Sequence, residues 1–403
     1  MNPCIRAQVL RFSALSLFAL PSLAPLALAP LTALAKEPPP PSQAIATPQQ
    51  QAPVPGRPLV QISILLDTSN SMDGLITQAK TELWRIVNEI ASYQKDGVQP
   101  EVQVALYEYG KQSLPAGEQF LRRISGLTTD LDRISEALFA LQTNGGDEFC
   151  GAVVDKAATD LEWSRSNSDY KAIFVAGNEP FDQGRIPWRE AVAKARKRGI
   201  VVNTIHCGGI SEGIQGRWRD AADAGGGSFI SIDQDVAQVS IPTPYDAEIG
   251  ALGEKLNDTY IGYGGQGKAM KQRQATQDSH AKSAGGSTAV ERASVKGKAV
   301  YSNENWDLVD AKKKKNLDVK KMEAAELPDE MKAMSPEQRQ VYVDGKAKER
   351  EEIQKKLADL DLKRRKFTEE QRKKDAVQDK GTFDAAMRKS VKAQMTEKAF
   401  APK

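Results

Sequence analysis

Three oxygen-bearing side chains stand at alternate positions in the sequence Asp67-Thr68-Ser69-Asn70-Ser71. Carboxylate and hydroxyl oxygens are the ligands that hard divalent cations such as Mg²⁺ prefer. Asp67, Ser69 and Ser71 can supply only part of the near-octahedral shell that Mg²⁺ requires, so another ligand must complete it. The spacing therefore predicts a site for Mg²⁺, Mn²⁺ or Ca²⁺ with an open position.

The pattern around these residues predicts the elements that position them. Residues 59–66 form an apolar run typical of a buried strand, and residues 76–90 repeat apolar side chains at helical spacing. Strand patterns then recur over 102–109, 119–124, 172–176, 200–206 and 228–232, and helical patterns over 131–141, 151–161, 187–198, 217–224 and 245–260. This alternation predicts an α/β fold, a doubly wound, mostly parallel sheet with helices on both faces. Ligands of such sheets bind at the carboxyl ends of strands, where Asp67 would lie.

The sequence Asp-Thr-Ser-Asn-Ser, placed between a buried strand and an amphipathic helix, resembles the von Willebrand factor A domain over residues 59–262. The resemblance implies a metal-ion-dependent adhesion site (MIDAS) at the top of the sheet. There Ser69 and Ser71 would bind Mg²⁺ directly, Asp67 would bind it through water, and a partner's carboxylate would complete the shell. The alternative is a polar strand-to-helix turn in which a serine caps the helix.

Two further loops normally complete such a site, and both depart from the family pattern here. The second loop usually presents a threonine, whereas this chain has residues 143–148, with Asp147 nearest to the expected position. The third loop usually carries an aspartate where this chain has Gly177, so Asn178 or Glu179 would have to supply the oxygen. The resemblance therefore implies either an altered metal site or one that has lost its metal.

The N-terminus is typical of a secretory signal peptide over residues 1–35. Arg6 and Arg11 supply positive charge around the start of an apolar stretch, and the small-x-small sequence before Lys36 suits cleavage. An uncleaved membrane anchor is the alternative, since the stretch could nearly span a bilayer. Residues 36–58, rich in Pro, Gln and Ala, are expected to form an extended linker. The pattern predicts a periplasmic or secreted protein.

Cleavage would remove Cys4 and leave Cys150 and Cys207 in an oxidising compartment. Cys150 would start the helix after the second loop and Cys207 would end a strand, so both are expected near the upper edge of the sheet. A disulfide between them is one interpretation, and two small buried thiols are the other. The chain has only two histidines, which argues against a histidine-rich zinc site or a Ser-His-Asp triad.

The C-terminal third differs in composition from the rest of the chain. Residues 263–327 are polar and rich in small residues, so we expect a flexible linker with one docking island at 299–311. Residues 328–403 are expected to form a charged, mostly helical tail, with a short coiled-coil seam formed by Ile353, Leu357 and Leu360.

Charge is distributed unevenly along the chain. Residues 266–403 hold 33 Lys and Arg against 23 Asp and Glu, whereas residues 36–265 hold 21 against 30. The basic tail could meet an anionic envelope surface or the acidic domain itself, or be merely a solvated surface. Nucleic acid is not an expected partner, because the lysines are interleaved with acidic residues and few aromatic residues are available for stacking.

Three functions are compatible with these patterns. The first is a non-catalytic protein-protein interaction module of the cell envelope, which binds an acidic side chain of a partner through the metal site. The second is a metal-free structural or scaffolding protein that acts through its helical tail. The third, less expected, is a Mg²⁺-dependent phosphohydrolase, which would need a general acid where Ser69 stands.

Overall fold

The computed structural model describes residues 56–232, 240–374 and 383–402. All of these residues belong to one compact unit. The expected signal peptide therefore lies outside the described residues, as does the expected linker up to residue 55.

Six strands form the central sheet in the order β4-β3-β1-β5-β6-β7. Their pairings are parallel apart from that of β3 with β4. The strands are β1 (Leu59–Asp67), β3 (Glu101–Tyr109), β4 (Leu121–Thr128), β5 (Tyr170–Gly177), β6 (Val201–Cys207) and β7 (Gly226–Ile232). A separate antiparallel pair joins β2 (Tyr93–Gln94) to β8 (Ala401–Pro402). The predicted α/β fold with a mostly parallel sheet is confirmed.

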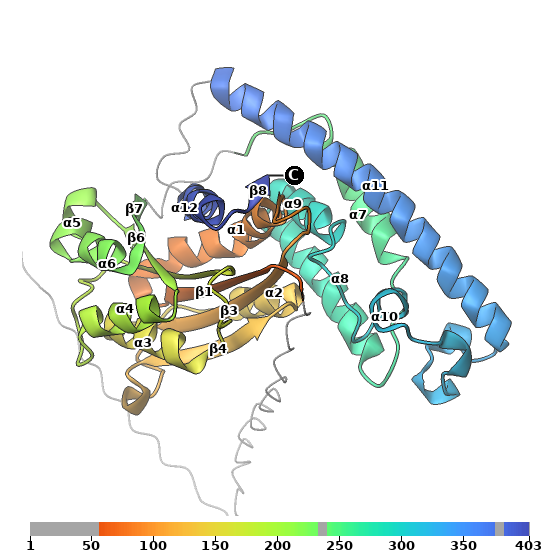
Figure 1. Cartoon of the computed structure of the whole chain (residues 1–403), viewed down its shortest axis with the longest axis horizontal. Helices are drawn as coiled ribbons and strands as arrows, with labels where there is room; N and C mark the ends of the chain where they lie inside the picture. The colour runs from red at the N-terminus through yellow and green to blue at the C-terminus, as the bar shows by residue number, and fades with distance from the viewer. Residues whose placement is uncertain (1–55, 233–239, 375–382, 403) are drawn as a thin grey trace, which may run out of the picture. The chain divides into compact units, whose positions relative to one another are not determined.

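Helices cover both faces of this sheet (Figure 1). Ile62, Ile64 and Leu66 of β1 pack into one core with α1 (Asp73–Ile90) and α2 (Leu131–Ala140). Leu65 points to the other core, which is shared with α3 (Cys150–Asp160), α4 (Trp188–Lys197) and α6 (Trp218–Gly225). β1 is buried along its whole length because it has a strand on each side and helices on each face.

The expected flexible linker is wrong for most of its length. Residues 267–296 form α8 (Gly267–Ala284) and α9 (Gly286–Lys296), and α9 is buried along most of its length. Its charged side chains find distant partners: Arg292 donates to Asp132 at 2.6 Å and to Asp278 at 2.5 Å, and Lys296 lies 2.9 Å from Asp278. A polar helix is stable inside the protein here because each buried charge is paired.

Three further helices, α7 (Asp246–Asn257), α11 (Pro336–Lys374) and α12 (Phe383–Glu397), pack into the core that contains α1. α10 (Leu308–Lys315) packs in a separate cluster, with Val343 of α11. Ile353, Leu357 and Leu360 of α11, the expected coiled-coil seam, are buried in the core that contains α1. The described part of the C-terminal region is therefore packed against the domain on this face.

α12 lies against the sheet beside α1, as Figure 1 shows. Met387, Val391 and Met395 are buried in the core of that face. Gln394 donates to Asn203 of β6 at 2.6 Å and accepts from the hydroxyl of Tyr170 at 2.8 Å. The last described residues then pair with β2, so the end of the chain forms part of the domain's own structure.

The expected docking island is also packed in place. Trp306 is buried and stacks on Tyr260, with ring centroids 5.7 Å apart. Asp307 is fully buried and bonded to Arg350 of α11 at 2.6 Å. The remaining short helices are η1 (Asn70–Met72), η2 (Ala116–Glu118), α5 (Ile210–Gln215), η3 (Val319–Lys321), η4 (Ala324–Glu326) and η5 (Asp329–Met331). Within the described residues we find no helix with the length and apolar character needed to cross a bilayer.

Candidate functional site

The loop after β1 gathers the three side chains that the sequence singles out. Asp67 ends β1 and is 0% exposed, and its Oδ1 accepts a hydrogen bond from the Ser69 backbone N–H at 2.7 Å. The Ser69 and Ser71 hydroxyl oxygens lie 3.2 Å apart. A short 3-10 turn at 70–72 follows at once and begins α1. One tight turn therefore places a carboxylate and two hydroxyls together at the carboxyl edge of the sheet.

The second loop contributes Glu148, which the sequence analysis did not select. Asp147, the residue selected there, is exposed, whereas Glu148 is only 6% exposed. A Cβ at Gly110 would lie 2.6 Å from Asp67 Oδ1 and 2.7 Å from Glu148 Cγ, so both carboxylate side chains converge on this glycine. The buried acid is Glu148 and not the predicted Asp147, because the path of the loop decides which of these two adjacent side chains turns inward.

The third loop has no room for a side chain at its first position. A Cβ at Gly177 would lie 2.5 Å from the Tyr109 hydroxyl and 3.1 Å from Asp67 Oδ2. The Tyr109 hydroxyl occupies this space and donates to the carbonyl of Ala176 at 3.0 Å. The carboxylate that the family places here is thus sterically excluded by the tyrosine.

The two substitutes proposed for that carboxylate differ in position. Asn178 donates to the Ser71 hydroxyl at 3.1 Å, which joins the third loop to the first. Glu179 is exposed and accepts from Gln183 at 3.2 Å. The structure therefore brings Asn178 into direct contact with the serine loop, whereas Glu179 lies at the rim.

One tryptophan and one histidine contact the backbone of this third loop. The sequence analysis selected neither residue. The Trp218 indole donates to the carbonyl of Glu179 at 2.8 Å, and His206 Nε2 lies 3.1 Å from the carbonyl of Asn178. Burial lowers the pKa of His206, which favours the neutral ring. The only signal in the sequence was the place of His206 near the end of a predicted strand.

Electrostatics at the site are unfavourable in the absence of a cation. Burial raises the pKa of Asp67 well above its ordinary value, and the nearby Glu148 carboxylate adds to this rise. Burial also raises the pKa of Glu148 to about 7, with Glu179 and Asp147 adding to the effect and the Ser69 side chain opposing it. Two buried carboxylates that face each other favour a bound proton or a cation between them.

The oxygen atoms at this edge fit a hard cation. Asp67 Oδ2, Glu148 Oε2 and Asn178 Oδ1 are buried and have no hydrogen-bond partner among the described residues. Unpaired buried polar atoms are costly and therefore uncommon, so three of them near one loop indicate a ligand. Together with the serine hydroxyls they form an all-oxygen set that suits Mg²⁺, Mn²⁺ or Ca²⁺. Across the described ranges there is no group of three or more His, Cys, Asp and Glu side chains arranged to hold a metal.

The proposed disulfide is wrong for this structure, in which Cys150 and Cys207 are both free and buried. Cys150 packs in the core on the α3 side of the sheet, and Cys207 packs in the core on the α1 side. The sheet itself separates the two sulfur atoms. Burial raises the pKa of both thiols, so neither is an activated nucleophile.

One family model matches the part of the chain that contains most of the central sheet. Residues 61–223 match the family model of the von Willebrand factor type A domain. Among solved structures, the chain is similar to proximal thread matrix protein 1 from the mussel byssus with zinc in its MIDAS motif, at 16% identity and a TM-score of 0.34, covering 43% of this chain and 42% of that chain.

Two further structures show similar values. The VWA domain of SpRpn10 is 20% identical with a TM-score of 0.33, covering 43% of this chain and 88% of that chain. An aerotolerance-related membrane protein from Bacteroides fragilis NCTC 9343 is 17% identical with a TM-score of 0.30, covering 43% and 92%. The chain thus spans less than half the length of the mussel protein. No curated protein matches the sequence.

Proposed function

Because the chain contains a von Willebrand factor A domain over residues 61–223, we propose that it is a non-catalytic protein-binding module with a divalent cation at the carboxyl edge of its sheet. Domains of this family commonly serve as interaction modules with a MIDAS. The observation that carries the proposal is the set of buried, unpartnered oxygens of Asp67, Glu148 and Asn178 beside the two serines.

In this proposal, Ser69 and Ser71 bind the cation directly, Glu148 takes the place of the family's second-loop threonine, and Asn178 replaces its third-loop aspartate. Asp67 orients the turn through its bond to the Ser69 N–H and holds the cation electrostatically. When bound, the cation would supply an open coordination position for an oxygen ligand. Ser71 and Glu179 are exposed, so this position faces solvent. A partner's acidic side chain suits it best.

Calorimetric titration of the full chain with MgCl₂, MnCl₂ and CaCl₂ tests the metal site. We expect binding heat and a rise in melting temperature with at least one of the three cations. Glu148→Gln should weaken that binding at least tenfold, because it removes a charged oxygen ligand. Asp147→Asn is the matched control and should bind as the wild type does. Absence of heat and of stabilisation with all three cations would reject the metal site.

A pull-down from envelope extract tests the partner. The wild-type chain should retain a protein in the presence of the bound metal and lose it on addition of a chelator. Ser71→Ala should lose the same protein, whereas Asp147→Asn should retain it. A partner retained equally in all four conditions would show that binding does not pass through this loop.

One observation favours the second function, a metal-free scaffold. Ser69, Ser71 and Asn178 already hydrogen-bond one another across the two loops, and a proton on Glu148 would satisfy part of the site without metal. In that case the C-terminal helices would carry the interactions. The same titration separates the two functions, since the scaffold requires no response to any cation.

The place of action that we propose is the periplasm or the exterior of the cell, after removal of the signal peptide. An association of the basic tail with an anionic surface is less strongly supported. Arg350 and Arg364 of α11 are buried in ion pairs with Asp307 and Glu291, so part of the tail's positive charge is already neutralised inside the protein. If the chain binds anionic vesicles and this binding weakens as the salt concentration rises, the remaining surface charge of the tail contacts the lipid surface.

A further inference from the structure

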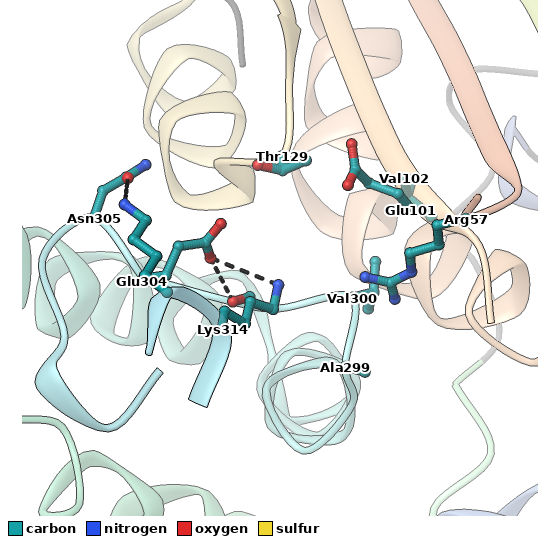
Figure 2. A pocket seen from close by; sticks show the side chains of 11 residues that line it. Arg57, Glu101, Val102, Thr129, Ala299, Val300, Glu304, Asn305 and Lys314 are labelled. Carbon is teal, nitrogen blue, oxygen red and sulfur yellow. Dashed lines mark hydrogen bonds and ion pairs between the residues drawn. The ribbon is translucent and has the colours of Figure 1, made fainter. Parts of the chain in front are cut away.

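A cavity of about 330 Å³ lies far from the metal loop, at the opposite end of the strands. Figure 2 shows Arg57 and Glu101 on one side of it and Glu304 and Lys314 on the other. One wall comes from the start of β3 and the residues before β1, and the other comes from the connection between α9 and α10 together with the end of α10. Its volume is at the lower end of the roughly 300–1,000 Å³ common for small-molecule sites.

The lining of this cavity carries charges of both signs. Arg57, Lys314 and Lys315 are cationic, and Glu101 and Glu304 are anionic. A dianion would meet two carboxylates and a dication would meet three cations, so neither suits the cavity. Hydroxyl and amide groups from Thr129, Ser302 and Asn305 add neutral hydrogen-bonding positions. The lining therefore favours a small polar molecule that carries both charges.

The charges differ in whether they already have partners. Glu304 accepts from Ser302 at 2.6 Å and lies 3.6 Å from Lys314, and these contacts lower its pKa. Lys315 donates to Asn305 at 2.5 Å. Arg57 and Glu101, by contrast, form no ion pair with any described residue. Figure 2 shows that their charged groups point in different directions rather than toward each other.

Arg57 is also held in place by the backbone. Its Nε donates to the carbonyl of Gln99 at 3.0 Å and its Nη2 to the carbonyl of Pro100 at 3.3 Å. These bonds orient the guanidinium, which leaves further N–H groups for a carboxylate. Glu101 accepts from Gln103 at 3.0 Å through Oε1, which leaves Oε2 for a donor. Val102 and Val300 add apolar surface to the lining.

We propose that this cavity binds a zwitterionic ligand of the amino-acid or dipeptide type, with its carboxylate on Arg57 and its ammonium on Glu101. Such a ligand would contact both the sheet and the connection between α9 and α10. Its binding should therefore stabilise the packing of the C-terminal helices on the sheet. The proposal is independent of the metal site and does not require that site to be occupied.

Thermal melting and calorimetry of the full chain with four probes test this proposal. L-alanine and glycylglycine carry both charges, propionate carries only the carboxylate, and propylamine carries only the ammonium. We expect the two zwitterions to bind and to raise the melting temperature, and the two single-charge probes to bind at least tenfold more weakly. Equal binding of propionate and alanine would overturn the zwitterion assignment, and no binding of any probe would overturn the site.

Single substitutions separate the two charge contacts. Glu101→Gln should remove the preference for alanine over propionate, and Arg57→Gln should remove the preference for alanine over propylamine. Arg57→Lys keeps the positive charge but loses the paired N–H donors of the guanidinium. It should bind alanine with an affinity between those of the wild type and Arg57→Gln. Arg165→Gln, at an exposed arginine elsewhere on the surface, is the matched control. Folded variants that keep the wild-type preferences would reject the assignment of Arg57 and Glu101.

Discussion

The loop edge of the sheet and the helical layer around α9 both bury charged side chains, but they differ in whether those charges have partners. Around α9, Arg292 and Lys296 lie against Asp132 and Asp278 in direct ion pairs. At the loop edge, Asp67 Oδ2 and Glu148 Oε2 are buried and have no hydrogen-bond partner in the part of the chain that the structure describes. A buried charge with a partner supports the fold, whereas a buried charge without one is the feature expected of a ligand-binding site.

Removal of residues 383–403 should have the largest effect, because it deletes α12, whose apolar side chains pack against α1 and the sheet. Met387, Val391, Met395 and Phe400 are all buried, and each fully buried apolar side chain contributes roughly 1.5–3 kcal/mol. A loss of this size is comparable to the whole stability of a domain. We expect an aggregated or partly unfolded product, as measured by circular dichroism and size-exclusion chromatography.

The matched control for this truncation is Lys389→Ala, on the exposed side of α12. It should melt as the wild type does. A truncated protein with a wild-type melting temperature would show that the last helix does not contribute to the stability of the domain. The helical layer and the loop edge would then differ less than the structure indicates.

Arg292→Ala should have the next largest effect. It leaves the buried Asp132 without its paired cation, leaves Asp278 with Lys296 alone, and removes the guanidinium that lies 4.5 Å from the centre of the Trp84 ring. Breaking a buried ion pair on one side costs about 3–5 kcal/mol. Urea unfolding should show this loss, whereas Lys363→Ala, at an exposed pair with Asp359, should leave the midpoint unchanged.

The same measurement on Glu148→Gln sharpens the comparison. Without metal, this substitution removes a carboxyl whose pKa is raised by burial, so stability at pH 8 should stay the same or rise slightly. A loss as large as that of Arg292→Ala would mean that Glu148 has a partner within the protein and that the loop edge is not a cation site.

These two regions also differ in how far the sequence predicts them. Asp67, Ser69 and Ser71 are neighbours in one turn after an apolar run, so their meeting depends on local structure alone. The sheet can be predicted equally well from the sequence, since its strands are β-branched and apolar runs separated by amphipathic helices. Local pattern was therefore sufficient for the fold class and for the first loop.

Long-range packing decides the features that the sequence did not predict. The choice of Glu148 over Asp147 depends on how the second loop meets Gly110, and the exclusion of a side chain at Gly177 depends on the Tyr109 hydroxyl of a neighbouring strand. α9 was missed because its charges are neutralised by residues as distant in sequence as Asp132, 160 positions away. Composition alone shows the charges but not their partners.

A moderate effect is expected from pH at the loop edge. The folded pKa of Glu148, about 7, lies above its ordinary value of 4.5, so the fold favours the protonated carboxyl. Its contribution to the metal-free protein is fully present below about pH 4.5 and is lost as pH rises through about 7. A cation must displace this proton, so its apparent affinity should weaken by about tenfold for each pH unit below about 7.

Titrations with the strongest-binding cation at pH 5.5, 6.5 and 8 measure this dependence. Asp67, whose pKa is also raised by burial, should steepen it. An affinity that does not change between pH 5.5 and 8 would place the cation away from both buried carboxylates.

The smallest effect, a change of about zero, is expected on reduction of the protein. Cys150 and Cys207 are free, and they pack into cores on opposite faces of the sheet, so no bond between them supports the fold. Melting temperatures with and without a reducing agent should agree. A lower melting temperature after reduction would show that Cys150 and Cys207 form a disulfide in the exported protein. The β6 end would then have to be displaced, because the sheet lies between the two sulfur atoms and a disulfide requires Cβ atoms about 3.5–4.5 Å apart.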